Sequence, residues 1–370
     1  MASLRDLLDR QRTRLLADPS FQRWASRFPL TRLVARRRAR SLFDLCNGFV
    51  YSQILQACVQ LDLLERLREG PVSAAELGGQ MGLDVDAADR LLNAAASLDL
   101  VTLRNDQYRL ASTGATLLGN PALLAMIRHH ALFYRDLCDP VGLLRGEAGE
   151  TELQRYWAYV RDDDRQDLAE RQVADYSDLM SASQPLIADQ VLAAMDLSNC
   201  RCLLDVGGGD GTFLAAVGQR ASHLQLMLFD LPAVADRARR RFVGTSLESR
   251  LTVHGGDFFA DPLPPGADVI SLVRVIHDHD DDRAMALLKS VRSSLPPGGT
   301  LLLAEPMSGT RGAETVGDAY FAFYLMAMGS GRPRSPRQLA DMLSAAGFAG
   351  SRLVPTPVPL QGQLIVAKVS

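Results

Sequence analysis

The segment Leu203-Leu204-Asp205-Val206-Gly207-Gly208-Gly209-Asp210-Gly211 is an apolar run that leads directly into a cluster of glycines. The apolar run predicts a buried strand, and the helical pattern that follows, Thr212–Ala221, places the glycines in a strand-to-helix turn. Glycine has no Cβ, so such a turn lets the backbone approach a ligand closely. The spacing is not the dinucleotide fingerprint, because Thr212 occupies its last glycine position. A purely structural turn would look similar.

The glycine turn begins an alternating pattern that fills the rest of the chain. Short apolar runs alternate with helical patterns, which predicts an α/β fold with a parallel, doubly wound sheet and ligands at the carboxyl ends of its strands. The expected strands are Arg201–Val206, Leu224–Asp230, Leu251–His254, Asp268–Ile276 and Thr300–Ala304. A helix at Pro336–Ala346 and strands at Arg352–Pro355 and Gln363–Val369 are expected to close the chain.

The first 190 residues read as mostly helical, and we predict two domains, 1–190 and 191–370. Within residues 55–115, two short helices are followed by Val101–Leu103 and Tyr108–Leu110 around an Asn105-Asp106 turn, which indicates a helix-turn-helix with a wing. Such modules bind DNA in many regulators. The second helix carries Asp84, Asp86, Asp89 and Asp99 against Arg90 alone, and these four carboxylates would repel phosphates. A structural module without a nucleic-acid partner is therefore favoured.

The composition of the chain excludes several classes of protein. The 370 residues are 47% hydrophobic and carry a net charge of −3, which indicates a globular protein with no general attraction for nucleic acid. The five cysteines show no CxxC spacing, so neither a disulfide framework nor a metal site is expected. The start of the chain lacks a secretory signal, and the expected location is cytoplasmic. Arg32, Arg36, Arg37, Arg38 and Arg40 form a basic stretch that could contact an anionic membrane, a second subunit or only solvent.

Carboxylates follow the next two predicted strands. Asp230 ends the second strand, where it could accept hydrogen bonds from the ribose hydroxyls of a nucleoside. Asp257 and Phe258 follow the third strand, where a carboxylate and an aromatic ring suit the amine and the face of an adenine. Alternatively, Asp257 caps a turn and Phe258 belongs to the core.

Together with Arg274-Val275-Ile276-His277-Asp278-His279, these segments resemble class I S-adenosylmethionine (SAM) methyltransferases, and among them the caffeate-type and acetylserotonin-type O-methyltransferases. The resemblance implies a Rossmann-like catalytic domain, an N-terminal helical dimerisation domain with a winged helix, and a homodimer. It also implies that Gly207 and Gly209 line the methionine part of SAM, that Asp230 holds the ribose, that Asp257 and Phe258 hold the adenine, and that Arg274 lies near the adenine.

The same resemblance assigns the chemistry. His277 falls on the catalytic base, which removes the hydroxyl proton of the acceptor, and Glu305 on the acid that orients its ring. Tyr176, Met180 and Ser183 fall where the family lines the methyl-transfer site, with Ser183 toward the cofactor. The family usually has a second acid where this chain has Pro333, which leaves His277 one orienting carboxylate. His279 and Asp280–Asp282 are expected to form a solvated helix start.

Aromatic residues and methionines suggest a long apolar cavity for a lipophilic substrate, with core packing as the alternative for each. They are Phe133, Tyr134, Tyr176, Met180, Phe321, Phe323, Tyr324, Met326 and Met328, of which Tyr134, Tyr176, Met180, Tyr324 and Met328 are our substrate-binding predictions.

Segments such as Phe133-Tyr134-Arg135-Asp136-Leu137 resemble the bacterial carotenoid O-methyltransferases that act on hydroxyneurosporene or demethylspheroidene. This implies methylation of a tertiary carotenoid hydroxyl. The alternatives are another lipophilic acceptor, such as a bacteriochlorophyll ring or a polyketide phenol, and a SAM-binding regulator without catalysis.

Overall fold

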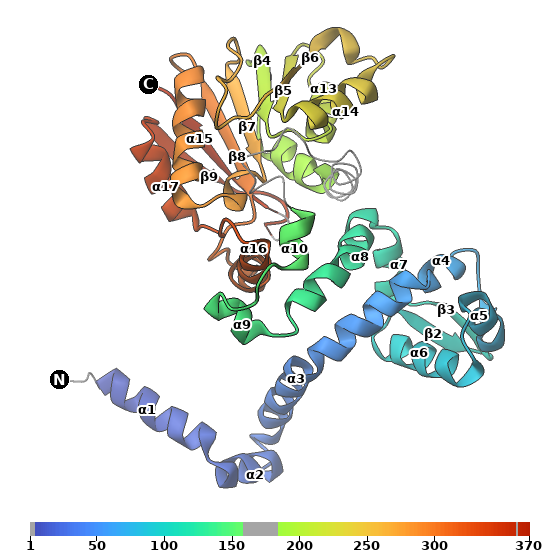
Figure 1. Ribbon diagram of the computed structural model, residues 1–370. Helices are drawn as coiled ribbons and strands as arrows, with labels where there is room; N and C mark the ends of the chain where they lie inside the picture. The colour runs from blue at the N-terminus through green and yellow to red at the C-terminus, as the bar shows by residue number, and fades with distance from the viewer. Residues whose placement is uncertain (1–3, 158–183, 360–361) are drawn as a thin grey trace. The chain divides into compact units, whose positions relative to one another are not determined.

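The computed structural model describes residues 4–157, 184–359 and 362–370 (Figure 1). Its contacts divide the chain into two compact units, Met1–Gly119 and Asn120–Ser370. This division falls earlier than the expected boundary at residue 190, because helices that follow residue 120 pack against a helix near residue 325 of the second unit.

The first unit begins with four helices, α1 (Leu4–Ala17), α2 (Pro19–Arg27), α3 (Arg32–Gln60) and α4 (Leu63–Arg66). The winged-helix pattern follows, with β1 (Val72–Ser73), α5 (Ala74–Met81), α6 (Val85–Ser97), β2 (Val101–Arg104), β3 (Gln107–Leu110) and α7 (Ser112–Leu118). The three strands pair in the order β1-β3-β2. Asn105 and Asp106 both have positive φ, as the tight turn between β2 and β3 requires. The Asp84 side chain caps α6 by accepting from the Ala87 amide at 2.8 Å, so one of the acidic residues has a structural function.

The second unit starts with α8 (Pro121–Asp136), α9 (Pro140–Arg145) and α10 (Glu152–Tyr156), all of which contact α16 (Ala322–Met328) or each other. A π-helix, η4 (Thr315–Phe321), leads directly into α16. Neither η4 nor α16 is among the elements expected from the sequence. π-Helical turns are rare and occur frequently at functional sites.

A seven-stranded sheet with order β6-β5-β4-β7-β8-β10-β9 forms the centre of the second unit. Its strands are β4 (Cys202–Val206), β5 (Gln225–Asp230), β6 (Leu251–Gly255), β7 (Val269–Val273), β8 (Thr300–Glu305), β9 (Gly350–Val354) and β10 (Gln363–Lys368). The expected parallel, doubly wound order is confirmed for β4 to β8. The sheet is mixed, however, because β10 runs antiparallel to both β8 and β9.

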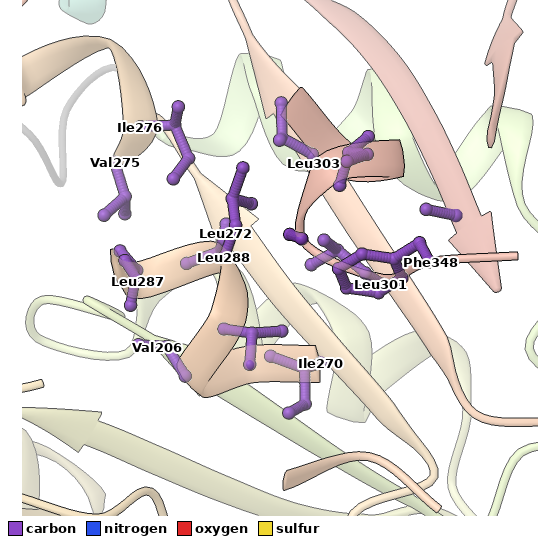
Figure 2. Packing of buried hydrophobic residues seen from close by; sticks show 14 of the residues in the cluster. Val206, Ile270, Leu272, Val275, Ile276, Leu287, Leu288, Leu301, Leu303 and Phe348 are labelled. Atoms are coloured by element: carbon purple, nitrogen blue, oxygen red, sulfur yellow. The ribbon is translucent and has the colours of Figure 1, made fainter. Parts of the chain in front are cut away.

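Helices α13 (Thr212–Arg220), α14 (Pro232–Phe242), α15 (Asp281–Ser294) and α17 (Pro336–Ala345) flank this sheet. Two apolar clusters cover its faces, and Figure 2 shows one, in which Val206, Ile270 and Leu301 of the strands pack with Leu287 and Leu288 of α15. The strand order reverses between β4 and β7, and ligands of such sheets bind outside the carboxyl ends at this position. No helix in the described ranges is long and apolar enough to cross a membrane.

Candidate active site

The glycine turn lies at the carboxyl end of β4, as expected. Gly207, Gly209 and Gly211 all have φ between 60° and 83°, which glycine adopts without strain. A Cβ at Gly211 would lie 2.5 Å from the Phe242 ring, so that glycine is required for packing. Among the described residues, no atom lies within 4 Å of a Cβ placed at Gly209. Gly209 therefore borders open space, where a ligand can approach the backbone.

Asp230 is joined to this turn. Its Oδ2 accepts from the Gly209 amide and its Oδ1 from the Leu231 amide, both at 2.7 Å. Burial raises the pKa of Asp230 to about 6, although both hydrogen bonds act to lower it. Beneath it, Asp205 is buried and accepts from Ser271 Oγ at 2.6 Å, and burial raises its pKa to about 7. The site thus holds two carboxyl groups that titrate near neutral pH.

The third strand end brings Phe258 to the glycine turn, because a Cβ on Gly207 would lie 3.8 Å from Phe258 Cε1. Asp257 caps the turn after β6 by accepting from the Phe259 amide at 2.9 Å. The expectation for His279 is wrong. Its ring is buried, with centroids 5.7 Å from Phe258 and 5.0 Å from Phe259, since the aromatic pair covers it. Asp280–Asp282 does form the exposed start of α15.

Arg274 lies directly after β7 with φ 57°, a left-handed conformation that is uncommon outside glycine. Its amide donates to Ala304 O at 2.8 Å and its Nη2 donates to Gln184 Oε1 at 2.7 Å. Such strained residues cluster at functional sites, where the surrounding structure fixes them. Here the strain lies three residues before His277.

His277 sits on the short helix η3 (Ile276–Asp278) and is 5% exposed. Its backbone amide donates to Glu305 Oε2 at 3.1 Å, so Glu305 holds the loop and not the imidazole ring. The ring contact expected of Glu305 is made by Asp278, whose Oδ1 lies 3.1 Å from His277 Nε2. Phe321 of η4 stacks on the same ring, with centroids 5.6 Å apart and planes inclined by 29°. Two buried atoms, His277 Nδ1 and Glu305 Oε1, have no hydrogen-bond partner within the described ranges.

The charges around His277 make it a stronger base. Burial acts to lower its pKa, but the charge and hydrogen bond of Asp278, followed by the charge of Glu305, outweigh burial, so the pKa is raised. Burial likewise raises the pKa of Glu305. Since Nε2 faces Asp278, Nδ1 is the ring atom left to accept a proton.

The segment 330–334, in which Pro333 replaces the expected acid, holds the His277 loop through its backbone. Ser330 Oγ donates to Asp278 O at 2.9 Å and the Arg332 amide donates to His277 O at 2.9 Å. A Cβ on Gly331, which has φ 77°, would lie 2.1 Å from His277 O, so only glycine permits this close approach.

Arg334 completes this clamp, and sequence reasoning missed it. Its side chain is fully buried and donates to Ile276 O at 3.0 Å and His279 O at 2.8 Å. It also pairs with Asp281 at 2.7 Å. Residues 330–334 therefore bind the carbonyls of four consecutive residues, 276–279. The five donors of a guanidinium suit this task, but nothing in the sequence distinguishes Arg334 from the exposed arginines around it.

An aromatic cluster lies next to this loop on α8, α10, η4 and α16. Tyr324 OH lies 2.7 Å from His129 Nε2 and accepts from Trp157 Nε1 at 2.8 Å. Tyr134 packs against the ring of His130. Of the predicted substrate residues, Tyr324 and Met328 are buried in this cluster, and Tyr134 borders it through the His130 ring, which contacts Tyr320. Tyr176, Met180 and Ser183 lie outside the described residues. In the described ranges, no group of three His, Cys, Asp or Glu could hold a metal ion.

Comparisons with known proteins identify the family. An O-methyltransferase domain model matches residues 134–349, and an O-methyltransferase dimerisation domain model matches residues 43–120. The chain is 45% identical over 361 residues to demethylspheroidene O-methyltransferase of Cereibacter sphaeroides, covering 97% of this chain and 95% of that one. The chain belongs to the O-methyltransferase family. It is a SAM-dependent enzyme, and both the predicted family and the predicted fold are confirmed.

Two further O-methyltransferases show the range of acceptors. The chain is 31% identical to 3-hydroxy-5-methyl-1-naphthoate 3-O-methyltransferase of Streptomyces sahachiroi over 315 residues, which cover 85% of this chain and 90% of that one. The crystal structure of human N-acetylserotonin methyltransferase in complex with SAM matches with a TM-score of 0.76 at 25% identity, covering 90% of this chain and 98% of that one.

The residues at the carboxyl ends of β4 to β6 fit SAM. The open space at Gly209 admits a ligand against the backbone, and the Asp230 carboxylate borders the same turn. Phe258 offers an aromatic ring close to Gly207. The glycine turn of this chain thus offers an open stretch of backbone, a carboxylate and an aromatic ring close together, and these groups can bind SAM.

Proposed function

We propose that this O-methyltransferase methylates the tertiary hydroxyl of a hydroxylated carotenoid of the hydroxyneurosporene or demethylspheroidene type. The observation that carries the proposal is the 45% identity to demethylspheroidene O-methyltransferase over nearly the whole of both chains. The dimerisation domain supports a homodimer. A carotenoid is dissolved in membranes, so contact with a membrane surface belongs to the proposal.

In the proposed complex, Gly207 and Gly209 hold the methionine part of SAM, Asp230 the ribose, and Asp257 with Phe258 the adenine. The Asp230 carboxylate accepts hydrogen bonds from the ribose hydroxyls in its ionised form. Bound SAM supplies a methyl group on a positively charged sulfonium, which is already activated for transfer. The protein therefore has to align the acceptor oxygen and remove its proton.

His277 removes that proton at Nδ1. Asp278 holds Nε2–H and so fixes the tautomer in which Nδ1 carries the lone pair. An aliphatic alcohol is a much weaker acid than a phenol, so proton removal has to accompany methyl transfer, and a base whose pKa is raised suits this step. Glu305 makes no hydrogen bond to the ring. It binds the backbone amide of His277, and its negative charge stabilises the imidazolium. Phe321 covers one face of the ring.

A phenolic acceptor is the second candidate, because the naphthoate O-methyltransferase is also similar over most of the chain. A bacteriochlorophyll ring and a regulator without catalysis have no comparable support. Asp84, Asp86 and Asp89 in the winged helix disfavour DNA, and His277 is held with two carboxylates next to it.

The test is transfer of labelled methyl from SAM to three detergent-solubilised acceptors: a carotenoid with a tertiary hydroxyl, a hydroxynaphthoate and a bacteriochlorophyllide. The proposal predicts label on the carotenoid oxygen, identified by mass spectrometry of the methyl ether. Label on the naphthoate or the macrocycle alone would contradict the carotenoid assignment. SAM binding without transfer to any acceptor would favour the regulator.

A further inference from the structure

The helix α1 (Leu4–Ala17) exposes an apolar face that no described residue of its own unit buries. Leu4, Leu7, Leu8 and Leu15 lie on one side of the helix and are 49–76% exposed; we call them the leucine face. No residue of α1 is buried. A helix without buried residues and with four exposed leucines on one side needs a partner, since burying each leucine is worth a substantial free energy.

The charges on α1 are arranged around the leucine face. In helical projection, Arg10 and Arg14 flank it on one side and Arg5 and Arg12 on the other, while Asp6, Asp9 and Thr13 lie opposite. This is the arrangement of helices that lie in a membrane interface. Their leucines enter the acyl region, and long arginine side chains extend sideways to the phosphates.

The next helix, α2, continues the pattern. Phe21 and Trp24 of α2 form a row of rings with Phe28, which directly follows the helix. The centroids are 5.6 Å and 4.9 Å apart, and Trp24 is 51% exposed. Arg23 and Arg27 line a groove of about 550 Å³ beside these rings. Tryptophan with arginine is typical of the headgroup region of a bilayer.

Charge decides between a bilayer and a protein partner. Residues 1–40 contain eleven arginines and three aspartates, with no lysine or glutamate, whereas the whole chain has a net charge of −3. Two copies of so basic a surface would repel each other, but an anionic bilayer attracts each arginine near it. The segment also precedes residue 43, where the match to the dimerisation domain begins.

We infer that α1 and α2 form a peripheral docking surface for an anionic lipid bilayer, with the leucine face and Trp24 entering the interface. Such a surface would keep the enzyme at the membrane that dissolves the proposed carotenoid acceptor. The biological purpose of this docking rests on the proposed function, but the lipid binding itself does not. Lipid binding is measured without turnover, so either claim can fail alone.

The experiment compares two variants of the full-length protein that add the same charge to opposite sides of α1, Leu8→Asp and Thr13→Asp. Binding is measured by co-sedimentation with vesicles of phosphatidylcholine alone and of a 3:1 mixture with phosphatidylglycerol. We expect binding to the anionic vesicles that weakens in high salt. Leu8→Asp should reduce the partition coefficient by at least about tenfold, and Thr13→Asp by less than about fivefold. Circular dichroism checks that both variants fold.

Tryptophan fluorescence gives an independent readout, because the chain has only Trp24 and Trp157 and the latter is 4% exposed. Anionic vesicles should shift the emission to shorter wavelength, and Trp24→Phe should abolish the shift. Equal vesicle binding by Leu8→Asp and Thr13→Asp would overturn the proposal. So would a Leu8→Asp protein that binds vesicles normally but has a changed mass in sedimentation velocity, since the leucine face would then contact a second copy.

Discussion

The contact between His277 and Asp278 allows a direct test of how the base is tuned. In Asp278→Asn the side chain keeps its shape and an acceptor oxygen but loses its charge. The contact is 3.1 Å long, and the two side chains are only 6% and 20% exposed. A hydrogen bond to a charged group in such surroundings contributes about 1.5–3 kcal/mol. If it is made in full only when the ring becomes charged, its loss slows the reaction by roughly tenfold to 150-fold.

The pH dependence follows from the same contact. Asp278 raises the pKa of His277, and His277 acts as a base only in its neutral form, so activity falls as the pH decreases through this pKa. Removing the charge lowers the pKa. The acidic limb of the pH–rate profile should therefore move to lower pH while the maximal rate falls. Profiles of kcat and kcat/KM, together with the SAM dissociation constant by calorimetry, measure both effects.

Asp282→Asn is the matched control, because it removes one charge from an exposed position four residues along the chain. It should leave the rate and the profile nearly unchanged. This function of Asp278 would be contradicted by an Asp278→Asn enzyme with the wild-type rate and the wild-type acidic limb. A loss of SAM affinity as large as the loss of rate would also refute it, since Asp278 is expected to act on the ring alone.

Three further predictions concern the cofactor and the clamp. Gly209→Ala and Gly244→Ala should each lower the free energy of unfolding by about 1–2 kcal/mol, because both glycines have positive φ and no described atom near the Cβ position. Only Gly209→Ala should also weaken SAM binding, by at least about tenfold in calorimetry. Arg334→Met should lower the free energy of unfolding by about 2–5 kcal/mol, whereas Arg332→Met, at an exposed position, should lower it by less than about 1 kcal/mol. Equal losses in denaturant titrations would show that Arg334 does not hold the His277 loop. Because burial raises the pKa of Asp230 to about 6, its carboxylate becomes protonated as the pH falls, and the affinity for SAM should drop about tenfold from pH 8 to pH 5. Asp230→Asn should bind SAM weakly, with little dependence on pH.

Sequence reasoning located the sheet and the strand-end residues because hydrophobic alternation and glycine turns are local signals. The resemblance assigned Gly209 and Asp230 to one SAM site and Glu305 to the ring of His277. The structure joins Gly209 to Asp230 by a hydrogen bond, but Glu305 binds the backbone amide of His277 and not its ring. It did not reveal which carboxylate contacts the imidazole, since that depends on the local path of η3 and not on spacing.

The clamp and the π-helix could not be found in the same way. Arg334 donates hydrogen bonds to backbone carbonyls about 55 residues earlier in the chain. Every residue has such a carbonyl, so the sequence does not show which residues accept these bonds. The aromatic residues of η4 and α16 follow a spacing that ordinary helical periodicity does not predict, because a π-turn changes the register. The antiparallel direction of β10 is likewise set by tertiary pairing.

The role of His277 as the base in carotenoid methylation is tested by single-turnover methyl transfer from SAM to a carotenoid with a tertiary hydroxyl. The wild-type enzyme is compared with His277→Asn, and SAM binding is measured in parallel. We expect a carotenoid methyl ether from the wild type, a rate in the variant that is lower by about 10²–10⁴-fold, and unchanged SAM affinity. A variant that transfers methyl at the wild-type rate would show that His277 is not the base.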